Sequence, residues 1–212
     1  MVKKNEIPDR LIDTAMRLAA ERGWSGLSLA EIAAEAELPL SQVYPLFDSK
    51  QAILSAFSRR LDAAVLAEEL SAEELAEPAR DRLFEVMMRR FDALQPYREA
   101  LANILYDSLR RPLQGLAGTP QLARSMRWML EAAGLNGEGV RGAVRVKGLS
   151  AIYLATLRVW LRDDSADLAK TMASLDAQLR RVEGLLNRSR SLRRPGARQE
   201  TPPPESAAEG AG

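Results

Sequence analysis

The sequence predicts an all-α protein with a small N-terminal unit and a larger helical body. Apolar residues recur at intervals of three and four along most of the 212 residues, which is the period of helices that bury one face. Serine or proline stands ahead of several of these stretches, at positions typical of helix starts. No stretch alternates apolar and polar residues in the manner of a half-buried strand, so no sheet is expected.

The first 52 residues are expected to form the N-terminal unit. An apolar helical pattern stops near Gly23, Ser25 or Ser28 can cap a second helix, and Asp48 or Ser49 can cap a long one. Residues 29–50 read LAEIAAEAELPLSQVYPLFDSK. A short helix, a tight turn and a second short helix at this spacing are typical of a helix-turn-helix DNA reader.

Residues 53–187 are expected to form the helical body. Ser71-Ala-Glu-Glu is a capping-box pattern, and Pro96 starts a further helix. From Ala143 to Leu161 the chain is apolar on most sides, which predicts a helix buried on several sides. A last helix is predicted from Ser165 to about Asn187.

Composition excludes most enzyme chemistry. The chain has neither cysteine nor histidine, so it lacks thiolate sites and the usual general base and metal ligand. We expect no catalysis, no cofactor and no bound metal. No signal-peptide core or apolar run of about 18 residues occurs. Together with a net charge of +1, this predicts a cytoplasmic protein.

The segment that would read bases has an unusual composition. Pro39 to Phe47 contains no Lys or Arg, and it includes Pro45. A proline inside a helix costs about 3 kcal/mol, and less if Ser41 caps the helix and Pro45 falls in its first turn. In either case we expect a groove-facing surface of Leu40, Val43 and Leu46. Tyr44 and Phe47 have an alternative interpretation as core of the unit. The candidate DNA contacts are Ser28, Ser41, Gln42, Tyr44 and Lys50.

Residues 11–54 resemble the N-terminal domain of the TetR family of bacterial repressors. The resemblance lies in apolar, glycine and polar positions shared with that domain: Ile12, Ala15, Leu18, Glu21, Gly23, Ser28, Ile32, Ala33, Ala36, Tyr44, Phe47, Ser49 and Lys50. It implies a TetR-like fold and a homodimer in which the last two helices pair with their copies. Small residues would allow close approach there, so the expected interface residues are Gly148, Ala151, Ala155 and Trp160.

Residues 146–179 resemble a second family, the accessory proteins of ubiquinone biosynthesis (the ninth Coq protein and its alphaproteobacterial relatives). The resemblance lies in the small-residue helix ending Leu157-Arg158-Val159-Trp160-Leu161, the break from Asp163 to Asp167, and Leu175-Asp176. It implies a TetR-like fold without repressor function. It also implies an isoprenoid lipid ligand and a di-iron quinone hydroxylase as partner. The three aspartates of the break also have a plain interpretation as helix caps.

Two further features bear on ligands. Adaptable Met and aromatic side chains are expected to line a pocket for an apolar small molecule or lipid: Met87, Phe91, Tyr97, Met126 and Met129. An ordinary core is the alternative.

The C-terminal end is basic. From Arg180 to Arg198 the chain contains seven arginines and one acidic residue, so this end can bind an anionic membrane surface or be a solvated tail. The tail from 188 to 212 is expected to be disordered.

Two functions follow from these patterns. The first is a lipid- or quinone-precursor-binding accessory protein of ubiquinone biosynthesis, peripheral at the inner face of the membrane. The second is a TetR-type transcriptional repressor that binds DNA through the helix-turn-helix and an apolar effector in its body. The stretch from Pro39 to Phe47 discriminates between them.

Overall fold

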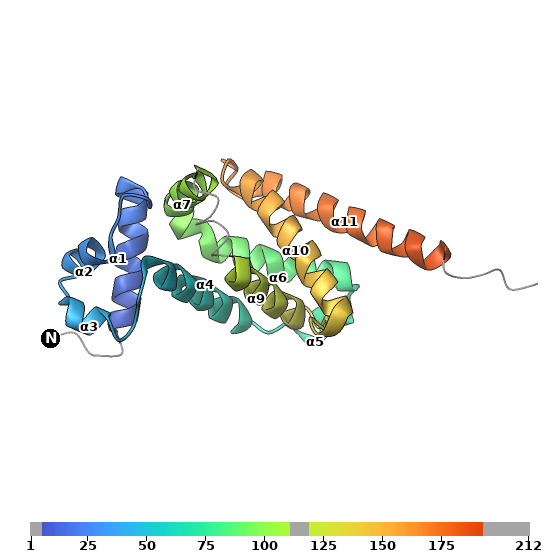
Figure 1. The fold of residues 1–212 in the computed structure, drawn as a ribbon. Coiled ribbons are helices and arrows are strands. Elements are labelled where there is room, and N and C mark those ends of the chain that lie inside the picture. The colour runs from blue at the N-terminus through green and yellow to red at the C-terminus, as the bar shows by residue number, and fades with distance from the viewer. Residues whose placement is uncertain (1–5, 111–118, 193–212) are drawn as a thin grey trace, which may run out of the picture.

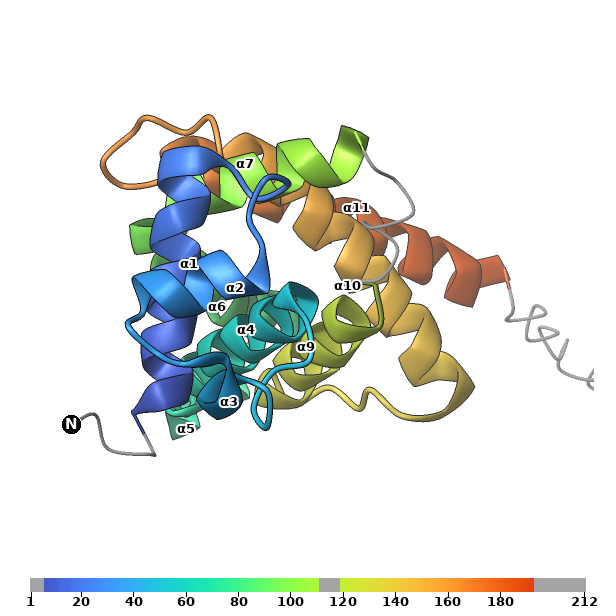
Figure 2. The same cartoon turned by 60° about the vertical axis from the view of Figure 1, so that its left-hand side comes forward.

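The computed structural model describes residues 6–110 and 119–192, and every regular element in these ranges is a helix (Figure 1). The all-α prediction is confirmed. The N-terminal unit consists of α1 (Ile7–Arg22), α2 (Leu29–Glu35) and α3 (Leu40–Val43). Helix α4 (Lys50–Leu66) leads from this unit into the body (Figure 2). The body contains α5 (Ala72–Ala76), α6 (Ala79–Leu94), the 3-10 turn η1 (Gln95–Tyr97), α7 (Arg98–Arg110), α9 (Thr119–Ala132), α10 (Gly139–Trp160) and α11 (Ala169–Leu192).

Serine side chains fix the starts of three helices. Ser28 caps α2 in a reciprocal capping box with Glu31, and Ser71 does the same for α5 with Glu74. Ser49 caps α4 through the N–H of the third helical residue. The two open alternatives are thus resolved in favour of Ser28 and Ser49, and the predicted capping box at Ser71 is confirmed.

A buried polar group ties three helices of the body together. The carboxylate of Asp62 on α4 accepts hydrogen bonds from the guanidinium of Arg90 on α6 and, at 2.6 Å, from the hydroxyl of Ser125 on α9. All three side chains are buried. Loss of either Asp62 or Arg90 would leave an uncompensated charge in an apolar core, which is strongly destabilising.

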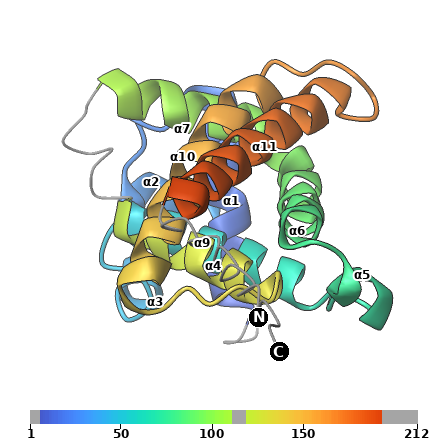
Figure 3. The same ribbon diagram turned by 90° about the vertical axis from the view of Figure 1, so that its right-hand side faces the viewer.

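The last two helices differ in extent from the prediction. Helix α10 begins at Gly139 rather than near Ala143, and α11 begins at Ala169 and continues to Leu192. The late start of α11 has a local cause, because Leu168 adopts a left-handed conformation with φ of 56°. The two helices lie side by side, and the red end of α11 points toward the viewer in Figure 3.

Candidate functional site

Helix α3, the expected reading helix, is a single turn held by two apolar side chains. Val43 is fully buried and Phe47 is 5% exposed. The N–H groups of Leu46 and Phe47 both donate to the carbonyl of Val43 at 2.9 Å, so the chain turns tightly after the helix. The interpretation of Phe47 as core is confirmed. The expectation that Val43 faces a DNA groove is wrong, because its side chain is buried in the core of the unit.

Two prolines limit the length of α3. The helix begins directly after Pro39 and has no side-chain cap, so the alternative in which Ser41 is the cap is wrong. Pro45 lies beyond the last helical residue, within the following turn. Because proline has no N–H, it cannot donate to the carbonyl of Ser41 and continue the helix.

Large apolar side chains are exposed on α3 and just after it. Leu40 is 53% exposed, Tyr44 79% and Leu46 39%. Ser41 and Gln42 are also exposed. The alternative interpretation of Tyr44 as core is wrong, because the ring projects away from the unit that Val43 and Phe47 close.

The N-terminal unit carries more acid than base. The first 52 residues contain eight acidic and six basic residues. Arg10 pairs with Glu37 at 2.7 Å, and Arg17 and Arg22 pair with Glu35 at 2.8 and 3.7 Å. The hydrogen bond from Arg17 lowers the pKa of Glu35. The three arginines of this unit are therefore held by acids rather than presented alone to a phosphate.

Lys50 and Ser28 hold the loop that enters the helix-turn-helix. The ammonium of Lys50 donates to the carbonyls of Trp24 at 2.7 Å and Leu27 at 2.8 Å, and it lies 5.1 Å from the centroid of the Trp24 ring. The hydroxyl of Ser28 bonds to Glu31. Of the candidate DNA contacts, those on α3 or just after it (Ser41, Gln42, Tyr44) project outward and make no such side-chain bond with residues 6–50. DNA contact by any of them stays a prediction.

A joint between α7 and the N-terminal unit has no signal in the sequence. The amide of Asn103 donates to the carbonyls of Ala19 and Ala20 at 2.9 and 3.1 Å. The carboxylate of Asp107 accepts from the backbone N–H groups of Trp24 and Ser25 at 3.0 and 2.6 Å. The joined residues are more than 80 positions apart in the sequence, so local patterns could not reveal it.

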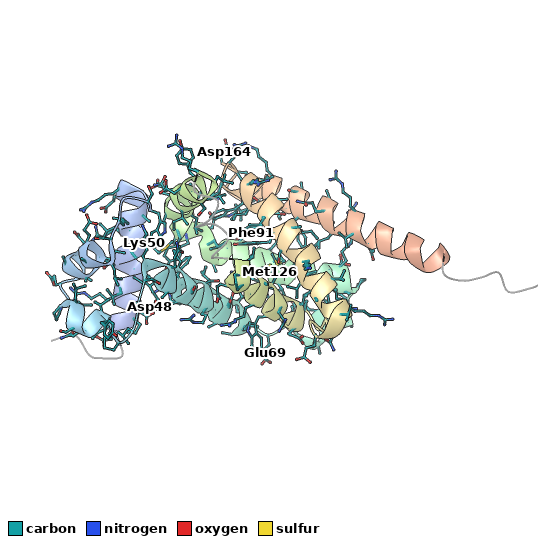
Figure 4. The ribbon with its side chains drawn as sticks, viewed as in Figure 1. Asp48, Lys50, Glu69, Phe91, Met126 and Asp164 are labelled. Carbon is teal, nitrogen blue, oxygen red and sulfur yellow. The ribbon has the colours of Figure 1, made fainter. Side chains whose placement is uncertain are left out.

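Four of the five predicted pocket residues lie together in the body. Met87, Phe91, Met126 and Met129 are fully buried, and Figure 4 labels Phe91 and Met126 within the helical body. They belong to one packed apolar core. In this structure they thus fill the space between the helices.

The fifth predicted pocket residue, Tyr97, lies elsewhere. Its ring packs edge-on against Phe57 with the centroids 4.8 Å apart. Its hydroxyl accepts a hydrogen bond from Arg60 at 3.1 Å. It lines an open cleft of about 500 Å³ between α1 and the η1–α7 segment. Tyr97 is separated from the other four because η1 carries it toward the N-terminal unit.

The outer face of α10 is exposed and apolar. Val140 is 84% exposed and Val144 65%. A methyl group added at Gly148 would meet no atom within 4 Å, and Ala151 is exposed while Ala155 is half-buried. Within the single chain, the inner side of this helix is buried as expected, and burial of its outer side against a second copy stays a prediction.

Trp160 is not available to a second copy, so its assignment to a dimer interface is wrong. It is fully buried within the chain. Its ring lies 6.1 Å from that of Phe91, and the guanidinium of Arg98 lies 4.7 Å above it. Helix α6 and the start of α7 supply these partners, which a pattern within α10 does not reveal.

The turn between α10 and α11 is built around one carboxylate. Asp163 is 1% exposed and accepts hydrogen bonds from the N–H and hydroxyl of Ser165 and of Thr171. Burial raises the pKa of Asp163, but these four hydrogen bonds together lower it well below 3.8. The Asp163 carbonyl accepts from Arg98. The interpretation of this aspartate as a cap is confirmed, and Asp167 also accepts from Ala169 N–H.

Within the described ranges, no helix has the length and apolar character needed to cross a membrane.

A family model of bacterial regulatory proteins of the TetR family matches residues 11–57. A second model, COQ9, matches residues 145–185, which span most of α10, the Asp163 turn and the first part of α11. No curated protein matches the chain.

Solved structures of TetR-family regulators have the same fold. A TetR transcriptional regulator from Nitrosomonas europaea is 28% identical, with 84% of this chain and 98% of that chain covered and a TM-score of 0.67. Regulators from Rhodococcus sp. RHA1 (16% identical, 84% and 98% covered, TM-score 0.57) and Streptomyces coelicolor (18%, 91% and 87%, 0.54) show the fold alone. The chain therefore has a TetR-like fold whose C-terminal part is similar to COQ9.

Proposed function

We propose that this chain is an accessory protein of ubiquinone biosynthesis that binds an isoprenoid lipid and does not read DNA sequence. The observation that carries the proposal is helix α3: it is one turn long and has no cation, and three of the exposed side chains on it or just after it are the large apolar Leu40, Tyr44 and Leu46. Sequence-specific readers need several phosphate contacts and a few hydrogen bonds to base edges. The outward candidates Ser41, Gln42 and Tyr44 are too few to supply both.

The similarity to COQ9 supports the same proposal. It covers the Asp163 turn, where a buried carboxylate accepts several hydrogen bonds, and parts of the two helices that the turn connects. In the accessory family, according to the resemblance described above, a TetR-like fold serves lipid binding rather than repression. A di-iron quinone hydroxylase is accordingly the proposed partner enzyme.

The proposed lipid site lies among Met87, Phe91, Met126 and Met129. These side chains close the space in this structure, so a lipid enters when the helices that carry them separate. Methionine suits such a wall, because its unbranched side chain adapts to the shape of a ligand. The proposed homodimer uses the exposed side of α10 around Gly148, Ala151 and Ala155.

The proposed membrane contact is the basic end that begins at Arg180. Arg180 and Arg181 are exposed, whereas the arginines from 188 onward lie outside the residues whose side chains are described. We expect the full chain to sediment with liposomes of anionic lipid. Replacing Arg188, Arg190, Arg193 and Arg194 with Gln should weaken that binding, and unchanged sedimentation would contradict the membrane contact.

The test of the main proposal is solvent extraction of the purified full chain. We expect an isoprenoid quinone or a precursor in the extract by mass spectrometry, in an amount approaching one per chain. A variant with Met126 changed to Trp should lose it, because the larger ring fills the site. A deletion strain should accumulate a quinone precursor.

A regulator is the second candidate, favoured by the likeness to the Nitrosomonas europaea protein over most of both chains. It predicts nanomolar, salt-sensitive binding to DNA upstream of the chain's own gene, with a footprint from α3 in the major groove. Such a footprint would replace the accessory role with gene control. Micromolar binding without sequence preference would support the accessory role.

A further inference from the structure

The outward side of α3 has the composition of a protein-docking surface. We propose that Leu40, Tyr44 and Leu46, here named the α3 patch, bind a helix of a partner protein with apolar residues on one side and Lys or Arg at its edges. The inference rests on the proposed function in one respect, namely that DNA does not occupy α3. The three side chains are 53%, 79% and 39% exposed, and tyrosine is among the residues that contribute most at protein interfaces.

The α3 patch sits on a rigid support. Leu40 and Tyr44 are one helical turn apart, so they project to the same side, and the N–H of Tyr44 donates to the carbonyl of Leu40 at 2.9 Å. Val43 and Phe47, which alternate with the patch residues, are buried in the core. A surface that is ordered before binding loses little entropy when a partner arrives.

Acidic side chains flank the α3 patch on both sides in sequence. Glu37 precedes it and Asp48 follows it, and no charged residue stands between them. The Glu37 side chain is 82% exposed even though it pairs with Arg10. Asp48 is exposed and accepts a hydrogen bond from the Ser49 hydroxyl (Figure 4). A partner with cations at the edges of its apolar strip matches this arrangement.

The acidic flanks argue against other occupants. The carboxylates of Asp48 and of Glu37, whose charge is partly offset by Arg10, disfavour DNA and anionic membranes, and α3 itself contains no cation. A second copy bound through the same patch would bring each acidic flank near its counterpart, because a two-fold interface uses identical surfaces. A cationic, apolar helix of another protein satisfies both the apolar and the acidic features.

The test uses the full chain and a synthetic probe. The probe is a fluorescent peptide of about 18 residues, or five helical turns, with Leu along one side and Lys at the edges. Its affinity is measured by fluorescence anisotropy, and hydrogen exchange locates the contact. We expect binding that protects the amides of residues 40–47, and a loss of at least about tenfold when Leu40, Tyr44 and Leu46 are all changed to Ser.

The matched control is a second exposed apolar pair, on α7. Tyr106 and Leu109 are 56% and 63% exposed, so changing both to Ser removes an exposed tyrosine and an exposed leucine elsewhere on the molecule. We expect unchanged affinity in this control. Changing Glu37 to Gln and Asp48 to Asn should weaken binding about threefold, and a probe with Glu in place of Lys should bind at least about tenfold less tightly.

Three results would overturn the docking proposal: equal losses in the α3 and α7 variants, equal affinity for the Lys and Glu probes, or protection outside residues 40–47. The lipid assay separates this proposal from the accessory role. A triple Ser variant that keeps its lipid but loses the probe supports docking. A wild-type chain that binds the probe but holds no lipid supports docking and counts against the accessory role alone.

Discussion

The α10–α11 turn and helix α3 both redirect the chain, but they are held in different ways. At the turn, the buried carboxylate of Asp163 accepts four hydrogen bonds. At α3, no side chain caps the helix, and Val43 and Phe47 anchor it by apolar packing. Apolar anchors fix where α3 lies without specifying what its outward side chains must be. The hydrogen bonds at the turn require particular residue types, so the part of the chain similar to COQ9 is chemically the more constrained.

The largest expected effect tests the apolar anchoring of α3. Changing Phe47 to Ala should lower the free energy of unfolding by about 3 to 5 kcal/mol, because it leaves a cavity in the core. Changing Tyr44 to Ala, one residue of the same segment with a 79% exposed side chain, should change it by less than about 0.5 kcal/mol. Urea unfolding measures both. Similar losses of unfolding free energy in the two variants would contradict a buried Phe47 and an outward-facing Tyr44.

The next effect tests the polar construction of the turn. Changing Asp163 to Ala should cost about 3 kcal/mol, because it removes a buried acceptor and leaves Ser165 and Thr171 donors without a partner. Asp164 is the matched control. Its side chain is 84% exposed and pairs with Lys170, so its change to Ala should cost less than about 0.5 kcal/mol. An equal cost at both positions would contradict the comparison.

The pH dependence of stability tests the hydrogen bonds to Asp163 in a second way. The folded-state pKa of Asp163 lies below 3.8, whereas an aspartate in an unfolded chain titrates near 3.9. The stabilisation is therefore present above about pH 4 and is lost as the pH falls through the folded-state pKa. The difference in unfolding free energy between the wild type and an Asp163→Asn variant should be constant from about pH 5 to 8 and shrink by about 1.4 kcal/mol per pH unit below 4. A difference that grows on acidification would contradict the lowered pKa.

The smallest effect concerns the missing cations of α3. Changing Leu40 and Leu46 to Lys places two charges on exposed positions. The variant should gain weak, nonspecific DNA binding whose salt dependence steepens by about 0.9 per phosphate contact formed. Leu109 and Leu75, exposed in α7 and α5, provide a control pair for Lys placed elsewhere. If the wild type already shows the steeper slope, α3 contacts phosphates without these lysines.

Local chemistry made part of the fold predictable from sequence. Ser28, Ser49 and Ser71 cap helices because a serine ahead of an apolar periodic stretch supplies the missing acceptor, and the pattern is contained in a few residues. The orientation of α3 was not predictable in the same way. A helix of one turn has no periodicity to read, so packing against the rest of the unit, including α2, decides whether Val43 or Tyr44 faces inward.

Long-range partners account for what the sequence did not reveal at the candidate sites. Trp160 is buried because Phe91 and Arg98 cover it, and both lie more than 60 positions earlier in the sequence. Tyr97 was grouped with the methionines by residue type, but η1 places it against Phe57 and Arg60. The similarity of residues 145–185 to COQ9 was detectable because the whole motif, including Asp163, is local.

The contacts of Asn103 and Asp107 have a mechanical consequence. Asn103 donates to two carbonyls at the C-terminal end of α1, and Asp107 accepts from the N–H groups of the two residues after Gly23. These four hydrogen bonds must break before the helix-turn-helix can move away from α7. A rotation of α7 therefore moves α1 with it. The amide protons of Trp24 and Ser25 should exchange with solvent only when the hydrogen bonds to Asp107 open.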